Sequence, residues 1–141
     1  IDINADGVHV GKGDPLSIED IKTMLERDTI IGVTANDIDD FIHLAGKKVG
    51  YIGLGPFRFT ETKKKLSPIL GLDGYRRIFK ELQERNIPYP PVVGIGGVTT
   101  EDVAALMGTG LHGIAVSSAI TASGNIPVAV MNFKETIIQY S

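Results

Sequence analysis

The chain has 141 residues, a hydrophobic fraction of 43%, a charged fraction of 22% and a formal net charge of −3. Length and composition predict one globular domain over residues 1–141. The slight acidic excess argues against a general nucleic-acid binder, and no apolar run approaches the ~20 residues of a membrane-spanning helix. Cysteine is absent, which excludes a disulfide framework and fits a reducing cytoplasm, where we expect the protein to act.

Taken in chain order, short apolar runs alternate with segments in which apolar residues recur every three or four positions. The runs lack strict two-residue alternation, which is typical of strands buried on both faces. Residues that can cap a helix, such as Ser17, follow the runs. We expect strands at residues 7–10, 29–34, 49–54, 92–95 and 111–116, and helices at residues 18–25, 38–45, 71–86, 101–107 and after Pro127.

This alternation predicts an α/β fold with a parallel sheet, either open and doubly wound or part of a (βα)8 barrel. Five βα units cannot close an eight-stranded barrel by themselves. The polar and glycine-rich segments follow the carboxyl ends of the expected strands, where both architectures bind ligands. These segments are residues 11–14, 34–37, 55–65, 96–99 and 117–118.

Residues 53–65, with the sequence GLGPFRFTETKKK, form the most informative segment. It leaves a buried strand and then carries hydroxyl groups and consecutive lysines, which are typical donors to a phosphate group. A solvated basic turn is the alternative interpretation. The segment therefore predicts an anion site at the end of the third expected strand.

Gly96-Gly97 and Ser117-Ser118 follow the next two expected strands. Glycines let the backbone approach a ligand, and the helix N-termini that follow add positive potential. In a barrel, the loops after the last two strands form a phosphate site. We therefore expect a phosphate between Gly97 and Ser118, with ordinary tight turns as the alternative.

Asp14 follows the first expected strand. A carboxylate there suits Mg²⁺, which bridges one or two carboxylates to substrate phosphates; taken alone, a turn aspartate is the stronger interpretation. The histidines His9, His43 and His112 lack metal-ligand spacing. We interpret them as structural, and His9 as a packed core or barrel-lining residue.

Together these segments resemble the thiamine-phosphate synthase family. The matches run in the family's order across essentially the whole chain, and the Gly-Pro…Thr-x-Thr-Lys loop combined with Gly-Ile-Gly-Gly is quite specific. They comprise residues 5–11 with Asp14, 51–56 with Thr60, Thr62, Lys63 and Lys64, 93–99, and 113–120. The resemblance implies a (βα)8 TIM-type barrel of which this chain covers roughly strands 4–8, the C-terminal two-thirds, without the N-terminal strands.

The resemblance implies a Mg²⁺-dependent transferase that joins hydroxymethylpyrimidine diphosphate to thiazole phosphate by dissociative substitution, giving thiamine phosphate and pyrophosphate. Its partners would be these phosphorylated small molecules, with no nucleic acid and no membrane, and a homo-oligomer is possible. Lys63 and Thr34 would be catalytic, and Asp14 would bind the metal. The implied substrate-binding residues are Thr34, Thr60, Glu61, Thr62, Lys63, Gly97, Ser117 and Ser118.

Two departures from the family pattern are Phe59, where the family usually has proline, and Lys12-Gly13, which replaces a polar-acidic pair. A thiazole tautomerase-like paralogue is one alternative, but it needs a base near residues 34–36, where Asn36 cannot serve. A non-catalytic phosphate-binding or regulatory module is the alternative of a different class.

Overall fold

The structure is a computed structural model that describes residues 5–25, 29–59 and 68–140. Its strands are β1 (Gly7–Val10), β2 (Ile30–Ala35), β3 (Tyr51–Leu54), β4 (Val92–Ile95) and β5 (Gly113–Ala115). Its helices are α1 (Ile18–Met24), α2 (Ile38–Leu44), α3 (Gly71–Glu84), α4 (Val103–Met107), α5 (Ser118–Thr121) and α6 (Ile126–Tyr140), and a 3-10 turn, η1 (Thr100–Asp102), precedes α4.

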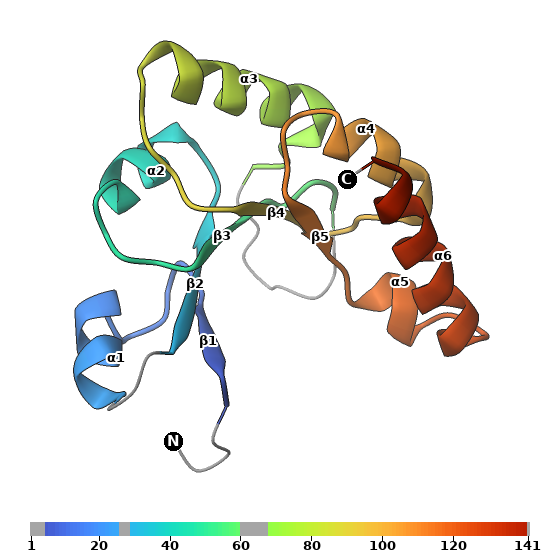
Figure 1. The fold of residues 1–141 in the computed structure, drawn as a ribbon, viewed down its shortest axis with the longest axis horizontal. Helices are drawn as coiled ribbons and strands as arrows, with labels where there is room; N and C mark the ends of the chain where they lie inside the picture. Colours follow the sequence, from blue (N-terminus) through green and yellow to red (C-terminus); the bar gives the residue numbers. More distant parts are fainter. Residues whose placement is uncertain (1–4, 26–28, 60–67, 141) are drawn as a thin grey trace.

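The five strands form one parallel sheet in the order β1-β2-β3-β4-β5. Strands that pair in sequence order are the arrangement of a barrel, whereas a doubly wound sheet reverses its order at a switch point. The sequence alternative of a doubly wound sheet is therefore wrong. Figure 1 shows the helices following one another around the strands.

The two sides of the sheet differ in chemistry. On the helix-facing side, the core includes Ile31, Val33, Ile52, Leu54 and Val92, all at most 4% exposed. The positions between them face the opposite side, which we call the inner side. The inner side carries His9, Gly32, Thr34, Tyr51 and Gly53.

Most element boundaries agree with the sequence expectations because the capping chemistry is local. Ser17 and Asp20 form a capping box at α1, and the Asp37 carboxylate accepts the Asp40 N–H as the N-cap of α2. The third strand begins later than expected, at Tyr51, because Val49 closes a turn onto the Lys47 carbonyl. The helix expected at 101–107 begins instead as the 3-10 turn η1.

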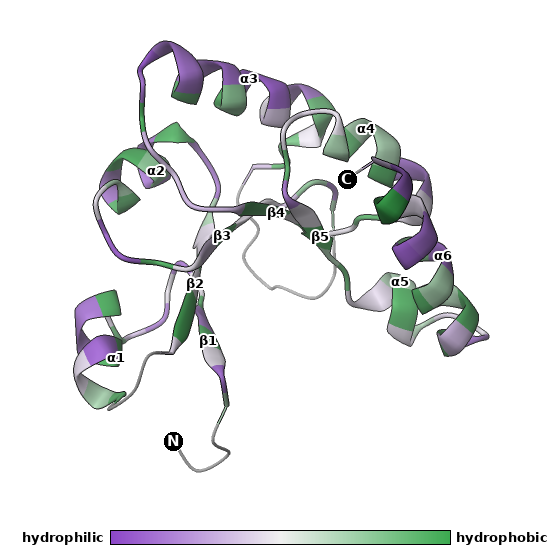
Figure 2. Cartoon of the chain, viewed as in Figure 1, coloured by the Kyte–Doolittle hydropathy of each residue, from purple (hydrophilic) through white to green (hydrophobic). Residues whose placement is uncertain are grey.

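Helix α6 is predominantly apolar and packs against α4 and α5. Phe133 is its one buried residue, and the exposed apolar residues are Ile126, Val128, Val130, Met131, Ile138 and Tyr140. Figure 2 shows hydrophobic colour on α5 and on parts of α6, where it alternates with hydrophilic colour. The helix expected after Pro127 is thus present and has an apolar surface that the described residues do not cover. No helix in the described ranges combines the length and apolar character needed to cross a bilayer.

Candidate functional site

The chain leaves β3 at the carboxyl edge of the sheet and is held between two neighbouring strand ends. The Gly55 N–H donates to the Ala35 carbonyl at 3.1 Å, and the Phe57 N–H donates to the Ile95 carbonyl at 2.9 Å. The Gly55-Pro56 peptide bond is cis. These bonds tie the start of the β3–α3 connection to the ends of β2 and β4.

The chain returns to the same place before α3 begins. The Leu70 N–H donates to the Pro56 carbonyl and the Gly71 N–H donates to the Phe57 carbonyl, both at 3.0 Å. The intervening residues 60–67 lie outside the described residues, but the described segments on both sides of them are bonded at the carboxyl edge.

Arg58 connects this loop to the loop after β4. Its guanidinium donates to both carboxylate oxygens of Asp102, at 2.8 and 2.9 Å, and to the Gly97 carbonyl at 3.0 Å. The Thr99 N–H and hydroxyl also donate to Asp102. Partial burial raises the pKa of Asp102, but the hydrogen bonds from Arg58 and Thr99 outweigh it and hold that pKa below its usual value. A bidentate pair of this kind fixes the orientation of both loops.

The Gly96-Gly97 turn is packed against that connection. Both glycines have positive φ, 88° and 71°, a backbone conformation that L side chains rarely adopt. A Cβ at position 97 would also lie 3.0 Å from the Phe59 carbonyl oxygen and 3.0 Å from the Arg58 Cβ. Position 97 therefore needs glycine for both its conformation and its surroundings.

Ser117 and Ser118 follow β5, the strand that pairs with β4. Both side chains are exposed. The Ser117 carbonyl accepts the Ile120 and Thr121 N–H groups as α5 begins. The structure thus places these serines and Gly97 after neighbouring strands, and a phosphate between Gly97 and Ser118 stays a prediction.

Three polar side chains from adjacent strands meet on the inner side of the sheet. His9 Nε2 lies 2.9 Å from Thr34 Oγ1, and His9 Nδ1 lies 2.9 Å from the Tyr51 hydroxyl. The His9 side chain is exposed, so the packed-core interpretation is wrong and the barrel-lining one fits. His43 and His112 bond to backbone groups, as expected for structural histidines.

Asp14 closes its own turn, because its Oδ2 accepts the Gly11 N–H at 2.6 Å. The side chain is exposed and offers one carboxylate at the carboxyl end of β1. Within the described part of the chain, no cluster of three or more acidic, histidine or cysteine side chains could hold a metal ion. A single carboxylate is compatible with Mg²⁺, which takes one or two carboxylates together with substrate phosphates.

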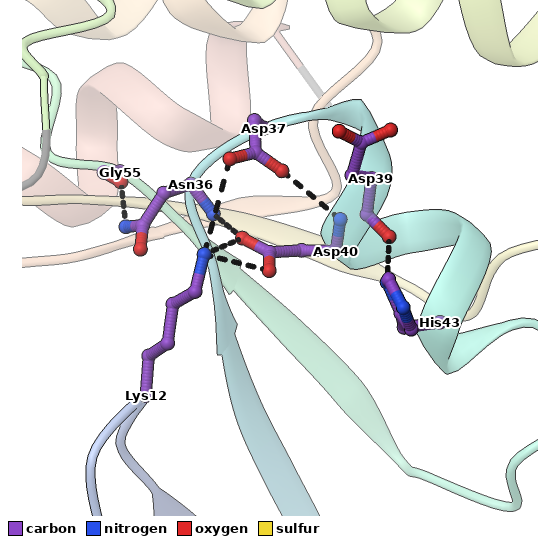
Figure 3. Close-up of polar contacts among 7 residues, drawn as sticks. All are labelled: Lys12, Asn36, Asp37, Asp39, Asp40, His43 and Gly55. Carbon is purple, nitrogen blue, oxygen red and sulfur yellow. Dashed lines mark hydrogen bonds and ion pairs between the residues drawn. The ribbon is translucent and has the colours of Figure 1, made fainter.

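Lys12 joins the loop after β1 to the start of α2 (Figure 3). Its ammonium lies 2.7 Å from Asp40 Oδ1 and 3.8 Å from Asp37 Oδ2. The Asn36 N–H donates to the same Asp40 carboxylate at 2.7 Å. The hydrogen bond to Asp40 raises the pKa of Lys12. Lys12, one of the departures from the family pattern, therefore has a structural role, because its ammonium forms an ion pair with the Asp40 carboxylate.

The sequence-predicted residues thus divide by location. Thr34 contacts His9, Gly97 packs on the Arg58 segment, and Asp14 bonds to its own loop. Thr60, Glu61, Thr62 and Lys63 lie outside the described residues.

Sequence reasoning missed Arg58, Asp102 and Tyr51. The Thr99-x-x-Asp102 spacing is a capping-box signal that could have found Asp102. The partners of Arg58 and Tyr51 depend on strand order and register, and these cannot be inferred from a short sequence motif.

Comparison with known proteins agrees with this arrangement. The sequence model described as thiamine monophosphate synthase matches residues 1–120. The chain is 47% identical over 135 residues to a thiamine-phosphate synthase of Flavobacterium johnsoniae, which covers 96% of this chain and 63% of that protein. It is 49% identical over 127 residues to a thiamine-phosphate synthase of Phocaeicola vulgatus, covering 90% of this chain and 60% of that protein. The chain therefore spans less than two thirds of the length of these curated relatives.

Solved structures give the same result. A thiamine phosphate pyrophosphorylase from Pyrococcus furiosus is similar with a TM-score of 0.80 at 27% identity, over 98% of this chain and 62% of that one. A 3-hexulose-6-phosphate synthase, at 15% identity and a TM-score of 0.60, covers 96% of this chain and 64% of its own and shows the fold alone. The sequence model and these relatives establish that the chain belongs to the thiamine monophosphate synthase family.

Proposed function

We propose that the protein carrying this chain joins hydroxymethylpyrimidine diphosphate to thiazole phosphate, giving thiamine phosphate and pyrophosphate. The observation that carries the proposal is the arrangement of the carboxyl edge in a member of this family. There, Arg58 joins the connection that leads into Thr60–Lys63 to the Gly97 turn. The five-stranded arc would correspond to strands 4–8 of a (βα)8 barrel, and residues 1–141 to its C-terminal two-thirds.

The reaction breaks the C–O bond at the pyrimidine methylene, so negative charge develops on the departing pyrophosphate. Groups that neutralise this charge and hold the thiazole close to the methylene lower the barrier. In this proposal the Lys63 ammonium and the Thr34 hydroxyl donate to the diphosphate, and Gly97, Ser117 and Ser118 hold the thiazole phosphate with Thr60, Glu61 and Thr62. Asp14 would hold Mg²⁺, which supplies positive charge to the diphosphate when bound.

This reaction needs no general base, because a neutral thiazole nitrogen is the nucleophile. Asn36, near which a tautomerase would need its base, is 8% exposed, and its amide donates to the Gly55 carbonyl. A carboxamide is too weakly basic to accept a substrate proton, which supports the transferase over the tautomerase alternative.

The test is to mix the full-length gene product with both substrates and Mg²⁺ and to measure pyrophosphate. Release that requires both substrates supports the transferase. Isomerisation of thiazole phosphate without release would support the tautomerase alternative, and binding without any reaction would support a phosphate-binding or regulatory module. A cytoplasmic location stays a prediction from composition.

A further inference from the structure

We propose that Tyr51 is a positioning residue: by donating to His9, it leaves the Thr34 hydroxyl hydrogen free to bond an anionic substrate oxygen. The inference rests on the proposed function, in which Thr34 contacts the diphosphate. It assigns a role to two inner-side residues, Tyr51 and His9, that lie outside the expected site.

The three side chains come from three adjacent strands, β3, β1 and β2. Tyr51 pairs in register with Gly32, and Gly32 pairs with His9. The His9 and Tyr51 ring centroids are 5.5 Å apart, and the two hydrogen bonds from the imidazole are each 2.9 Å long. The imidazole therefore bridges the Tyr51 and Thr34 hydroxyls.

Two glycines make room for this bridge. A Cβ at position 32 would lie 2.1 Å from Tyr51 Cζ, and a Cβ at position 53 would lie 3.1 Å from His9 Cε1. Neither glycine has the positive φ that would require glycine for conformational reasons. The space that these positions leave is filled by the two rings, so the glycines and the rings form one packed arrangement.

The chemistry of a neutral imidazole gives this bridge a direction, because one ring nitrogen donates and the other accepts. If Tyr51 donates to Nδ1, the Nε2–H donates to Thr34 Oγ1, and the threonine keeps its own hydrogen for another acceptor. In the reverse arrangement, the Thr34 hydroxyl donates its hydrogen to Nε2. It then presents only lone pairs to the substrate, and these repel a diphosphate oxygen.

The first arrangement is favoured by the two hydroxyls themselves. A phenol, with a pKa of about 10, is a stronger donor than an aliphatic hydroxyl, so Tyr51 rather than Thr34 is the donor to the ring. The tautomer of His9 is then the Nε2–H form, and an incoming anion is met by the Thr34 hydrogen.

The tautomer is tested by ¹⁵N NMR of the imidazole nitrogens in the full-length gene product at neutral pH. We expect the Nε2–H form at His9 in the parent protein and a mixture of tautomers in Tyr51→Phe. His43 and His112 serve as internal references, and loss of a signal in His9→Gln identifies His9. A parent Nδ1–H form, or a Tyr51→Phe variant with the parental tautomer, would overturn the inference.

The functional consequence is tested by a double-mutant cycle on the KM for the pyrimidine diphosphate. Tyr51→Phe should raise this KM by roughly fivefold, the effect of one neutral hydrogen bond, with a smaller effect on kcat. In a Thr34→Val background Tyr51→Phe should change nothing further, whereas in a Thr34→Ser background, which retains the hydroxyl, its effect should persist. Equal effects in the Val and Ser backgrounds would contradict the role.

Tyr89→Phe is the matched control, because Tyr89 precedes β4 at the opposite edge of the sheet and packs on Phe41 and Phe79. It should leave the KM unchanged. If the parent protein released no pyrophosphate, the proposed function would fail, and the NMR experiment would still decide the tautomer. The two failures are therefore distinguishable.

Discussion

Removing the Arg58 side chain should lower the free energy of unfolding and also raise the KM for thiazole phosphate. Arg58→Ala deletes the bidentate pair with Asp102 and the bond to the Gly97 carbonyl. The Arg58 side chain is 50% exposed and that of Asp102 is 13% exposed, so solvent screens part of the interaction. An exposed ion pair contributes at most about 1 kcal/mol, and the bond to the carbonyl adds about 1 kcal/mol. We expect a loss of about 1–2 kcal/mol in the free energy of unfolding.

Urea unfolding of the full-length gene product measures this loss, with Arg76→Ala as the matched control. Arg76 pairs with Asp73 at 3.3 Å, but their side chains are 62% and 94% exposed, so its removal should cost less than about 0.5 kcal/mol. Arg58→Lys should recover only part of the loss, because an ammonium cannot make the bidentate pair. Equal midpoints for Arg58→Ala and Arg76→Ala, with an unchanged KM for thiazole phosphate, would refute the reasoning.

The pH dependence gives an independent check on the same pair. The pKa of Asp102 is lower in the folded protein than its ordinary value of 3.8, so its contribution to stability is present above pH 3.8 and is lost as the pH falls through the folded-state value. The stability difference between the parent protein and Arg58→Ala should therefore shrink in acid below pH 3.8. A difference that grew there would contradict the assignment.

Four further predictions concern the other loops. Lys63→Ala should lower kcat by about 10²–10³-fold, as expected for one charge-stabilising group; near-parental turnover would remove Lys63 from the mechanism. Gly97→Ala should cost about 1–3 kcal/mol in unfolding free energy because of its positive φ, whereas Gly13→Ala, whose added Cβ meets nothing within 4 Å, should be close to neutral. Lys12→Met should cost about 0.5–1 kcal/mol at pH 7. Because the pKa of Lys12 is raised above 10.5, that difference should vanish as the pH rises through the raised value; persistence in strong alkali would argue against the ion pair. Asp14→Asn should raise the Mg²⁺ concentration needed for half-maximal pyrophosphate release, and an unchanged Mg²⁺ titration would exclude Asp14 as a ligand.

The features that could be predicted from the sequence are local ones, which depend only on residues close together along the chain. The Ser17–Asp20 capping box, the strand Val92–Ile95 and the glycine turn after it all depend on a few consecutive positions. The order of these elements left a barrel and a doubly wound sheet as alternatives, the resemblance to the family implied the barrel, and the observed strand order excludes the doubly wound sheet.

The features that escaped prediction depend on pairing between strands. The spacing of His9 and Tyr51 along the chain carries no signal, because their contact arises from the registers of two strand pairs and from the space at Gly32. In the sequence, Arg58 is one of several basic residues in the loop after β3. Its partner Asp102 follows β4, and the two residues come together only in the folded structure. The exposure of His9 likewise follows from which side of the sheet it occupies, and an apolar strand pattern alone does not distinguish the two sides.

The arc of strands ends, among the described residues, in β1 on one side and β5 on the other, each with a single neighbour. A strand with one neighbour keeps a row of backbone donors and acceptors that can pair with a further strand. The outer edges of β1 and β5 are therefore the places in the described part of the chain where a second polypeptide strand could pair with this sheet, and pairing between copies of the chain would compete with folding.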